Sequence, residues 1–269
     1  MAEPNAQFRE KFEILKSLIL NSTMTVALTG AGVSTLSGIP DFRSAGGVYS
    51  SQWEGYDVEE VLSISFFRRR PDLFYRWGNE FMYQLERSTP SIIHTVLALL
   101  EQKGYLQGLF TQNIDMLHKK AGSKKYWEIH GSAEHHSCTN CNAHYSYEQI
   151  APIVRKGEVP HCTRCQAVVR PDIVFYGENL DSAVLTRAVE MFREAQLCLV
   201  LGSSLVVQPA ASLPSYALSH GSQLVIVNAQ RTAYDRAATV CFNDLAQVGE
   251  ALSSWAAGLT SRKALMPSP

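Results

Sequence analysis

The chain has 269 residues, a length that allows one large domain or a core domain carrying a smaller one. Its hydrophobic content of 46% and charged content of 18% exclude the compositions of disordered, collagen-like and coiled-coil proteins. The formal net charge is −1, so no overall field draws the protein to nucleic acid or to an anionic membrane.

The beginning of the chain, MAEPNAQFREKF, has no basic segment followed by an apolar stretch. No apolar run reaches the roughly 18 residues that a membrane-spanning helix needs. These features predict a cytoplasmic protein with no membrane partner.

Short apolar runs and helical patterns alternate along the chain. Spacing between Phe8 and Leu20 predicts an amphipathic helix, and the run Met24–Leu28 predicts a strand that leads into a glycine-rich turn. Comparable runs recur at Leu109–Thr111, Tyr126–Ile129, Leu197–Leu201, Leu224–Val227 and Thr239–Phe242, with helical patterns at Ser91–Lys103 and Ser182–Ala195. Unalternated runs between helices are typical of a parallel sheet covered on both faces. We therefore predict an α/β fold with a doubly wound, Rossmann-like parallel sheet.

Two stretches interrupt this alternation and are interpreted as insertions. Residues 44–86 are rich in aromatic residues and arginine and have a helical pattern, whereas residues 132–170 contain two CxxC pairs. We predict that they form one small module, and that the sheet domain is discontinuous. Its expected segments are 1–43, 87–131 and 171–259, and the polar tail 260–269 is expected to be disordered.

The cysteine spacing predicts a metal site. Cys138 and Cys141 form one CxxC pair, and after 20 further residues Cys162 and Cys165 form a second. In a reducing compartment this spacing favours a zinc ribbon over disulfides. Four thiolates close a tetrahedral shell, so the zinc is expected to be structural. Four nearby histidines could substitute as ligands, namely His135, His136, His144 and His161.

Zinc ribbons also bind nucleic acid, but residues 131–170 carry only four basic against three acidic side chains. That is a weak footprint for phosphate binding, and no direct nucleic-acid partner is expected.

The segment Thr29-Gly30-Ala31-Gly32-Val33-Ser34 follows a predicted strand and suits close approach of the backbone to a pyrophosphate. Thr35 stands where the dinucleotide fingerprint has a third small residue, and Glu54 does not end a predicted strand. The sequence thus fits a dinucleotide ligand but not a hydride-transfer dehydrogenase.

Further polar residues follow the predicted strands, where the carboxyl ends of parallel strands form the ligand-binding edge. The loop Gly38–Arg43 places an acid, an aromatic ring and a guanidinium in succession. Other groups at this edge are Thr111–Asp115, His130-Gly131, Gly202-Ser203-Ser204 and Asn228.

Together with Pro171–Glu178 and the two CxxC pairs, these motifs resemble the sirtuins, NAD-dependent protein lysine deacylases. The matching motifs stand in the family's order over roughly residues 25–252. The resemblance implies that NAD is consumed as the acyl group of a lysine moves to ADP-ribose. A mono-ADP-ribosyltransferase on the same fold would share every NAD residue and remains the alternative. A zinc-ribbon binding protein that had lost catalysis would lack His130 or Asn113, and both are present.

The resemblance also implies roles for single residues. His130 would be the general base, and Ile39, Asp41, Phe42, Asn113 and Asp115 would surround the nicotinamide and its ribose. Ala31, Gly32, Ser203 and Ser204 would hold the phosphates, and Asn228 the adenosine ribose. The remaining NAD-binding positions would be Gly30, Ser34, Arg43, Gln112 and Gly202.

For the substrate, the resemblance implies an acyl-lysine protein bound as an extended strand between the two domains. Val174, Tyr176 and Val206 would line an apolar tunnel, while Gly177, Glu178 and Asn179 would pair with the substrate backbone. Relatives that prefer acidic acyl chains resemble one another in a Phe-Tyr-x-x-Arg motif. Here Tyr75 is present but Gly78 replaces the arginine, and Arg76 should point to another side of its helix. We therefore expect a preference for neutral acyl groups.

Overall fold

Six short apolar segments form one parallel sheet in the computed structural model, which describes residues 5–42, 44, 46–50 and 52–262. The strands are β1 (Thr25–Thr29), β2 (Gly108–Thr111), β3 (Tyr126–Glu128), β7 (Leu197–Leu201), β8 (Gln223–Val227) and β9 (Val240–Phe242). Their spatial order is β3-β2-β1-β7-β8-β9, and every neighbouring pair is parallel. Each strand lies at a predicted apolar run, so the predicted doubly wound α/β fold is confirmed.

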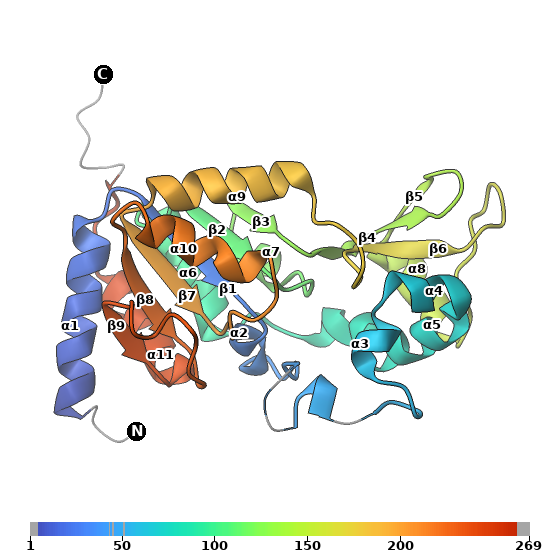
Figure 1. Ribbon diagram of the computed structural model, residues 1–269, viewed down its shortest axis with the longest axis horizontal. Coiled ribbons are helices and arrows are strands. Elements are labelled where there is room, and N and C mark those ends of the chain that lie inside the picture. Colours follow the sequence, from blue (N-terminus) through green and yellow to red (C-terminus); the bar gives the residue numbers. More distant parts are fainter. Residues whose placement is uncertain (1–4, 43, 45, 51, 263–269) are drawn as a thin grey trace.

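Alternate residues of each strand face opposite helical layers, because successive side chains of a strand point to opposite faces. In β1, Ala27 packs with helices α1 (Ala6–Asn21), α6 (Ile92–Gln102) and α11 (Leu245–Ala257). Val26 and Leu28 pack instead with α9 (Ser182–Glu194), η3 (Ala210–Ser212) and α10 (Leu213–Leu218). Figure 1 shows these two layers enclosing the sheet. Burial on both faces explains why the strands lack polar alternation.

The two predicted insertions come together in a second lobe with its own core (Figure 1). Its antiparallel sheet has the order β5-β4-β6, formed by β4 (Gly131–Cys138), β5 (His144–Ser146) and β6 (Val169–Ile173). Its helices are α3 (Val58–Val61), α4 (Ile64–Arg69), α5 (Pro71–Glu80), η2 (Met82–Arg87) and α8 (Tyr147–Arg155). Strands β4 and β6 are two of the connections between this lobe and the parallel sheet.

The end of the described chain contacts the large lobe. The Arg262 guanidinium lies 4.2 Å from the Tyr105 ring centroid, and its backbone N–H donates to the Lys103 carbonyl over 2.9 Å. The guanidinium of Arg262 also donates to the Ile19 carbonyl, near the end of α1, over 3.0 Å. The tail predicted to be disordered covers 260–269, of which 263–269 lie outside the described residues.

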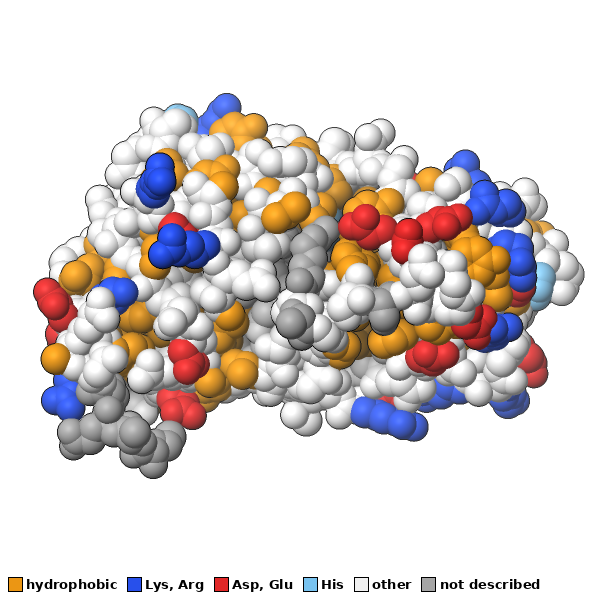
Figure 2. Space-filling view, turned by 60° about the horizontal axis from the view of Figure 1, so that its bottom comes forward, with side chains coloured by type: hydrophobic (Ala, Val, Ile, Leu, Met, Phe, Trp, Pro, Cys, Tyr) orange, Lys and Arg blue, Asp and Glu red, His pale blue; other side chains and the backbone are white. Residues whose placement is uncertain are grey.

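No helix within the described residues is both long and apolar enough to cross a membrane. Figure 2 shows acidic and basic side chains interspersed over the face that it presents, in keeping with the nearly balanced charge.

Candidate functional site

The turns after β1 and β7 touch each other at the carboxyl edge of the sheet. The Gly30 N–H donates to the Leu201 carbonyl over 3.1 Å, and the Gly32 N–H donates to the Gly202 carbonyl over 2.9 Å. A Cβ on Gly30 would lie 2.7 Å from the Gly202 carbonyl oxygen, so this approach requires glycine. Strand order reverses at β1 and β7, and helix α2 (Gly32–Thr35) begins there. Open α/β sheets bind their ligands at such a point.

A buried hydrogen-bonded cluster lies beside these turns. The Asn113 side-chain amide donates to the Gly30 carbonyl and to Ser34 Oγ, each over 3.1 Å. Ser34 Oγ donates to Asp115 Oδ2 over 2.5 Å. The other Asp115 oxygen accepts from the N–H of Leu117, the first residue of α7 (Leu117–Lys120), over 2.9 Å. The structure thus joins four predicted site residues from two strand ends into one rigid group.

His130 lies just beyond β3, and its ring is oriented by the backbone of the neighbouring strand end. Its Nδ1 lies 2.9 Å from the Gln112 carbonyl oxygen. Because that oxygen can only accept, Nδ1 carries the hydrogen and Nε2 keeps its lone pair. Burial lowers the pKa of His130, and the bond to Gln112 partly opposes this effect. The imidazole is therefore neutral at pH 7 and can accept a proton at Nε2.

The Gln112 side chain connects His130 with the turn after β7. Its Oε1 accepts from Ser203 Oγ over 3.0 Å. Its Nε2 is buried and has no hydrogen-bond partner among the described residues. A buried amide that lacks a partner is uncommon in a native protein, and it suits a site that receives a polar ligand.

The predicted loop after α2 is folded against its own continuation. Asp41 Oδ1 accepts from the Ser44 N–H over 2.8 Å, and the Val48 N–H donates to the Asp41 carbonyl over 2.8 Å. The Phe42 ring centroid lies 5.1 Å from that of Tyr49, in η1 (Val48–Ser50).

Other predicted residues of the NAD set take separate positions. The Ile39 N–H donates to the Ser34 carbonyl over 3.2 Å, which holds the start of the loop against the polar cluster. Asn228 follows β8, and its side chain donates to the Gln230 carbonyl over 2.8 Å. Ala31 and Ser204 lie within the two touching turns, next to Gly30 and Ser203. Arg43 lies outside the described residues.

The predicted substrate residues lie on the connections between lobes and on the loop after β7. Val206 is 59% exposed, Tyr176 is 36% exposed and Val174 is half-buried. Glu178 forms a two-pronged ion pair with Arg170, with N–O distances of 2.6 and 2.7 Å. The backbone N–H of Glu178 donates to the Phe175 carbonyl. Any pairing of Glu178 with a substrate strand would therefore use the backbone carbonyl oxygen of Glu178.

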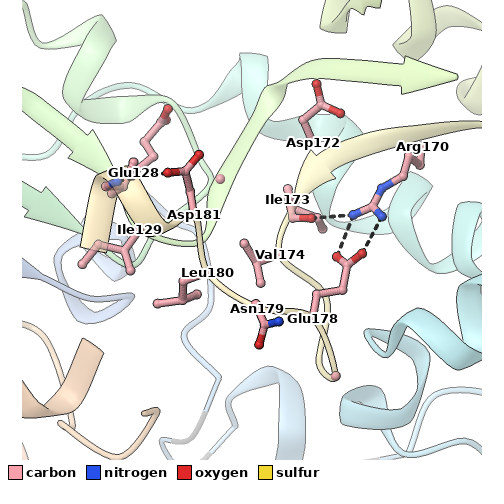
Figure 3. A pocket seen from close by; sticks show the side chains of 13 residues that line it. Glu128, Ile129, Arg170, Asp172, Ile173, Val174, Glu178, Asn179, Leu180 and Asp181 are labelled. Atoms are coloured by element: carbon pink, nitrogen blue, oxygen red, sulfur yellow. Dashed lines mark hydrogen bonds and ion pairs between the residues drawn. The ribbon is translucent and has the colours of Figure 1, made fainter. Parts of the chain in front are cut away.

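A cavity of about 630 Å³ lies where the connecting strands meet (Figure 3). Four predicted substrate residues line it, namely Val174, Gly177, Glu178 and Asn179. Glu128 also lines it, and burial raises the pKa of that carboxyl to about 7. Glu128 is not among the predicted site residues, because a lone acid in a short strand belongs to no recognisable motif.

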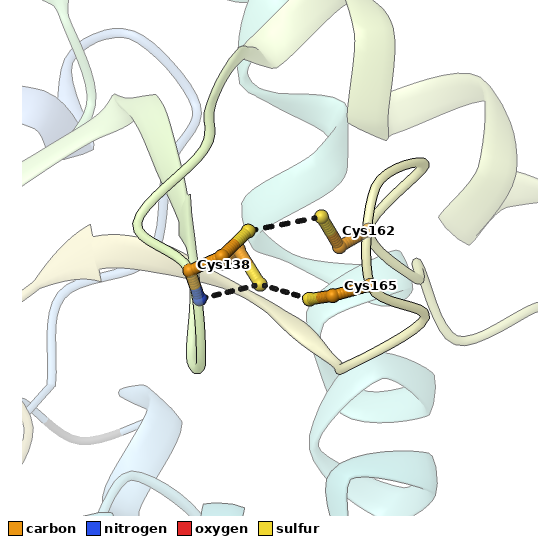
Figure 4. Close-up of side chains that lie close together, drawn as sticks. Cys138, Cys162 and Cys165 are labelled. Atoms are coloured by element: carbon orange, nitrogen blue, oxygen red, sulfur yellow. Dashed lines mark hydrogen bonds between the residues drawn. The ribbon is translucent and has the colours of Figure 1, made fainter.

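The four predicted metal ligands form one cluster (Figure 4). Their sulfur atoms all lie within 4.8 Å of one another, and the Cys138–Cys165 and Cys141–Cys162 sulfur distances are 3.4 and 3.5 Å. Such distances are far longer than a disulfide bond and close to the edge of roughly 3.8 Å in a tetrahedral zinc–thiolate site. The cluster contains no histidine; His136, for example, is bonded to Tyr83 instead. The donor set fits one structural zinc ion.

His94 and His118, which are not among the predicted site residues, form a buried imidazole pair near Asp115. Their ring centroids lie 4.6 Å apart. His94 Nδ1 accepts from the Ser91 N–H, and His118 Nε2 lies 2.9 Å from Thr29 Oγ1. His94 lies among apolar residues of α6, and His118 lies in the short helix α7 before two lysines. Spacing alone therefore gives no sign that the two rings meet.

Comparisons of sequence and of structure with known proteins match this chain to the same family. A model described as the Sir2 family matches residues 30–209. The NAD-dependent protein deacetylase of Thermotoga maritima is 42% identical over 233 residues, which cover 87% of this chain and 93% of that protein.

Solved structures are similar over nearly the same length. Sir2 with a deacetylated p53 peptide and 3′-O-acetyl ADP-ribose aligns with a TM-score of 0.83 at 41% identity, over 90% of this chain and 96% of that one. Sir2Tm bound to a propionylated peptide also gives 0.83, at 40% identity, over 92% and 99%.

Proposed function

This chain belongs to the Sir2 family and is an NAD-dependent protein deacetylase, and we propose that the edge around Asn113, Asp115 and His130 is its active site. NAD, when bound, would supply the ADP-ribose that accepts the acyl group, and its nicotinamide would be the leaving group. The substrate is an acyl-lysine protein. The cytoplasmic location expected for this chain stays a prediction.

The two touching turns suit the NAD phosphates. The lack of a Cβ at Gly30, Gly32 and Gly202 lets the two turns pack directly against each other. Turns of this kind at the carboxyl ends of strands are where α/β proteins bind the pyrophosphate of a dinucleotide. Ala31, Ser203 and Ser204 would complete the phosphate contacts, and Asn228 would bind the adenosine ribose. The unpartnered Gln112 amide supports a ligand at this edge, because it would gain a hydrogen bond there.

Asn113, Ser34 and Asp115 would hold the nicotinamide half. Their mutual bonds fix each side chain before the ligand arrives, which lowers the entropy cost of orienting it. Ile39, Asp41 and Phe42 would cover the nicotinamide from the adjoining loop. This enclosure would exclude water from the bond that breaks.

His130 would move the proton. Because the Nδ1–H donates to the Gln112 carbonyl, the Nε2 lone pair is free to take a proton from a ribose hydroxyl as the acyl group is transferred to that hydroxyl. This oriented, neutral imidazole beside the polar cluster is the observation that carries the proposal.

The acyl-lysine would enter between the lobes. Val174, Tyr176 and Val206 would contact its stem, and Gly177, Glu178 and Asn179 would pair with the peptide as an added strand. Solved structures of relatives with a p53 peptide and with a propionylated peptide support this class of partner. The four cysteines would hold zinc away from the chemistry and stabilise the small lobe.

Incubation of the protein with an acetyl-lysine peptide, with and without NAD, tests the proposal. We expect free nicotinamide and O-acetyl-ADP-ribose only when both are present. His130→Ala should keep NAD binding and lower kcat by about two to four decades, the usual contribution of a general base. Transfer of labelled ADP-ribose to the protein substrate without deacetylation would instead support the transferase alternative.

A further inference from the structure

Two loops that lie far apart in the sequence are joined by their tyrosine hydroxyls. The oxygens of Tyr49 and Tyr176 lie 2.9 Å apart, so one hydroxyl donates to the other. Tyr49 belongs to the loop that continues from Asp41, and Tyr176 to the connection that follows β6. The contact therefore joins the two segments to which the proposed function assigns different ligands.

The backbone of Tyr176 is fixed to the small lobe on both sides. Its N–H donates to the Leu62 carbonyl over 2.9 Å, and its carbonyl accepts from the Ile64 N–H over 3.0 Å. The ring is 36% exposed and its hydroxyl end reaches Tyr49. The Tyr176 side chain thus extends from backbone that is hydrogen-bonded to the small lobe toward the loop that contains Asp41 and Tyr49.

Tyr49 in turn is coupled to Phe42. Its N–H donates to the Phe42 carbonyl over 2.9 Å, and the two ring centroids lie 5.1 Å apart. A change in the position of Tyr49 is therefore transmitted to both the backbone and the ring of Phe42. A substrate that contacts Tyr176 can thus change the position of Phe42 through the side chain of Tyr49.

We propose that the Tyr49–Tyr176 hydroxyl pair is a positioning link that couples acyl-lysine binding to NAD binding. The inference rests on the proposed function, because it takes Tyr176 as a wall of the acyl-lysine tunnel and Phe42 as a cover of the nicotinamide. Acyl-lysine packed against Tyr176 restricts that ring, and the hydroxyl bond then restricts Tyr49 and Phe42. NAD binds to a loop that has already lost part of its freedom, so it pays less ordering entropy. By linkage, NAD raises the affinity for acyl-lysine by the same factor.

Calorimetry on the intact protein tests the link through substitutions that remove only hydroxyl groups. The probes are an acetyl-lysine peptide and carba-NAD, an analogue whose nicotinamide ribose oxygen is replaced by a methylene group, so that no reaction occurs. The dissociation constant of each is measured with and without a saturating amount of the other, for the wild type, Tyr49→Phe, Tyr176→Phe and the double variant. Tyr105→Phe is the matched control, since its hydroxyl bonds to the Thr260 carbonyl in the opposite part of the large lobe.

We expect each ligand to tighten binding of the other in the wild type and in Tyr105→Phe. In Tyr49→Phe the coupling factor should fall by about 3- to 10-fold, the range expected for one hydrogen bond. Tyr176→Phe should give the same loss, and the double variant should lose no more than either single variant. The dissociation constant for carba-NAD alone should change much less than the coupling factor, which distinguishes a link from general destabilisation.

Equal coupling in the wild type and both single variants, or additive losses in the double variant, would overturn the proposal. Absence of coupling in the wild type would overturn it as well. Failure of the proposed function has a different signature, because an intact wild type would then bind neither probe or would release no deacetylated peptide from natural NAD.

Discussion

His130 illustrates how one backbone contact sets the chemistry of a residue. The Gln112 carbonyl determines which ring nitrogen carries the hydrogen, and burial keeps the ring neutral. A histidine after a short strand is visible in the sequence, whereas its tautomer is not, because the carbonyl belongs to a different strand end. The sequence therefore identifies His130 as the candidate residue, and the structure adds the tautomer and the charge state in which it could act.

The depressed pKa of His130 predicts the acid limb of the pH–rate profile. A base must be neutral, so kcat/KM for an acetyl-lysine peptide should fall as pH drops through the pKa of the free enzyme. Because burial lowers that pKa, the midpoint should lie below the ordinary value of about 6.5. Steady-state rates between pH 5 and 8 provide the measurement, with His130→Ala as the variant that should lose this limb. A midpoint above 6.5 would contradict the role.

Arg76 predicts the acyl preference. It pairs with Glu54 and lies 5.7 Å from the Trp53 ring centroid, while the buried Tyr75 hydroxyl donates to the Val169 carbonyl. The carboxylate of an acidic acyl chain would thus be buried without an ion pair to Arg76 and without a hydrogen bond from Tyr75. We expect kcat/KM for a succinyl-lysine peptide to be about 100-fold or more below that for the acetyl form. Arg76→Ala should leave this ratio unchanged. Comparable rates on the two peptides would mean that another cation reaches the acyl chain.

Elements of the large lobe follow from local pattern more closely than those of the small lobe. The runs predicted for β1 and β7 match strands buried on both faces, since short apolar segments of this kind fit little else in an α/β protein. The small lobe has a core built from segments distant in sequence. The Tyr83 hydroxyl, for example, lies 2.8 Å from His136 Nε2, and no sequence spacing predicts that these two residues form a hydrogen bond. The CxxC pairs indicated the metal cluster but not the helices that pack around it.

Metal removal should act on the small lobe before the sheet domain. The thiolate shell contributes to folding free energy directly, so Cys141→Ser should lower bound zinc and the thermal midpoint. Cys241→Ser is the matched control, because that cysteine lies outside the cluster. Metal analysis and calorimetric melting would measure both effects. Full metal content and an unchanged midpoint in Cys141→Ser would exclude the structural role.

The stability of the fold depends in part on buried groups that must stay neutral. Burial lowers the pKa of His94 to about 4, with the charge of Asp115 acting in the opposite direction, and burial also lowers that of His118. Unfolding returns such a histidine to its ordinary pKa of about 6.5, so the unfolded state binds more protons below that pH. The stability that the neutral ring provides is thus complete above pH 6.5 and is lost as pH falls toward 4.

Urea unfolding at pH 7.5 and pH 5.5 checks this expectation. His94 alone should reduce the free energy of unfolding by about 1.4 kcal/mol at the lower pH. His94→Gln should be less stable than the wild type at pH 7.5 but should lose less on acidification. An equal pH dependence in the variant would show that His94 does not contribute to it.

The strand order has a consequence for synthesis on the ribosome. Strand β1 lies between β2 and β7, yet β7 begins at Leu197, long after β1 ends at Thr29. Both segments of the small lobe are made in this interval, which at typical translation speeds lasts on the order of ten seconds or more. Until β7 emerges, the nascent chain carries one unpaired edge of its central strand, and such edges pair readily with other chains. Until β7 is made, nascent copies of this protein therefore carry an exposed strand edge at which they can pair wrongly with other chains.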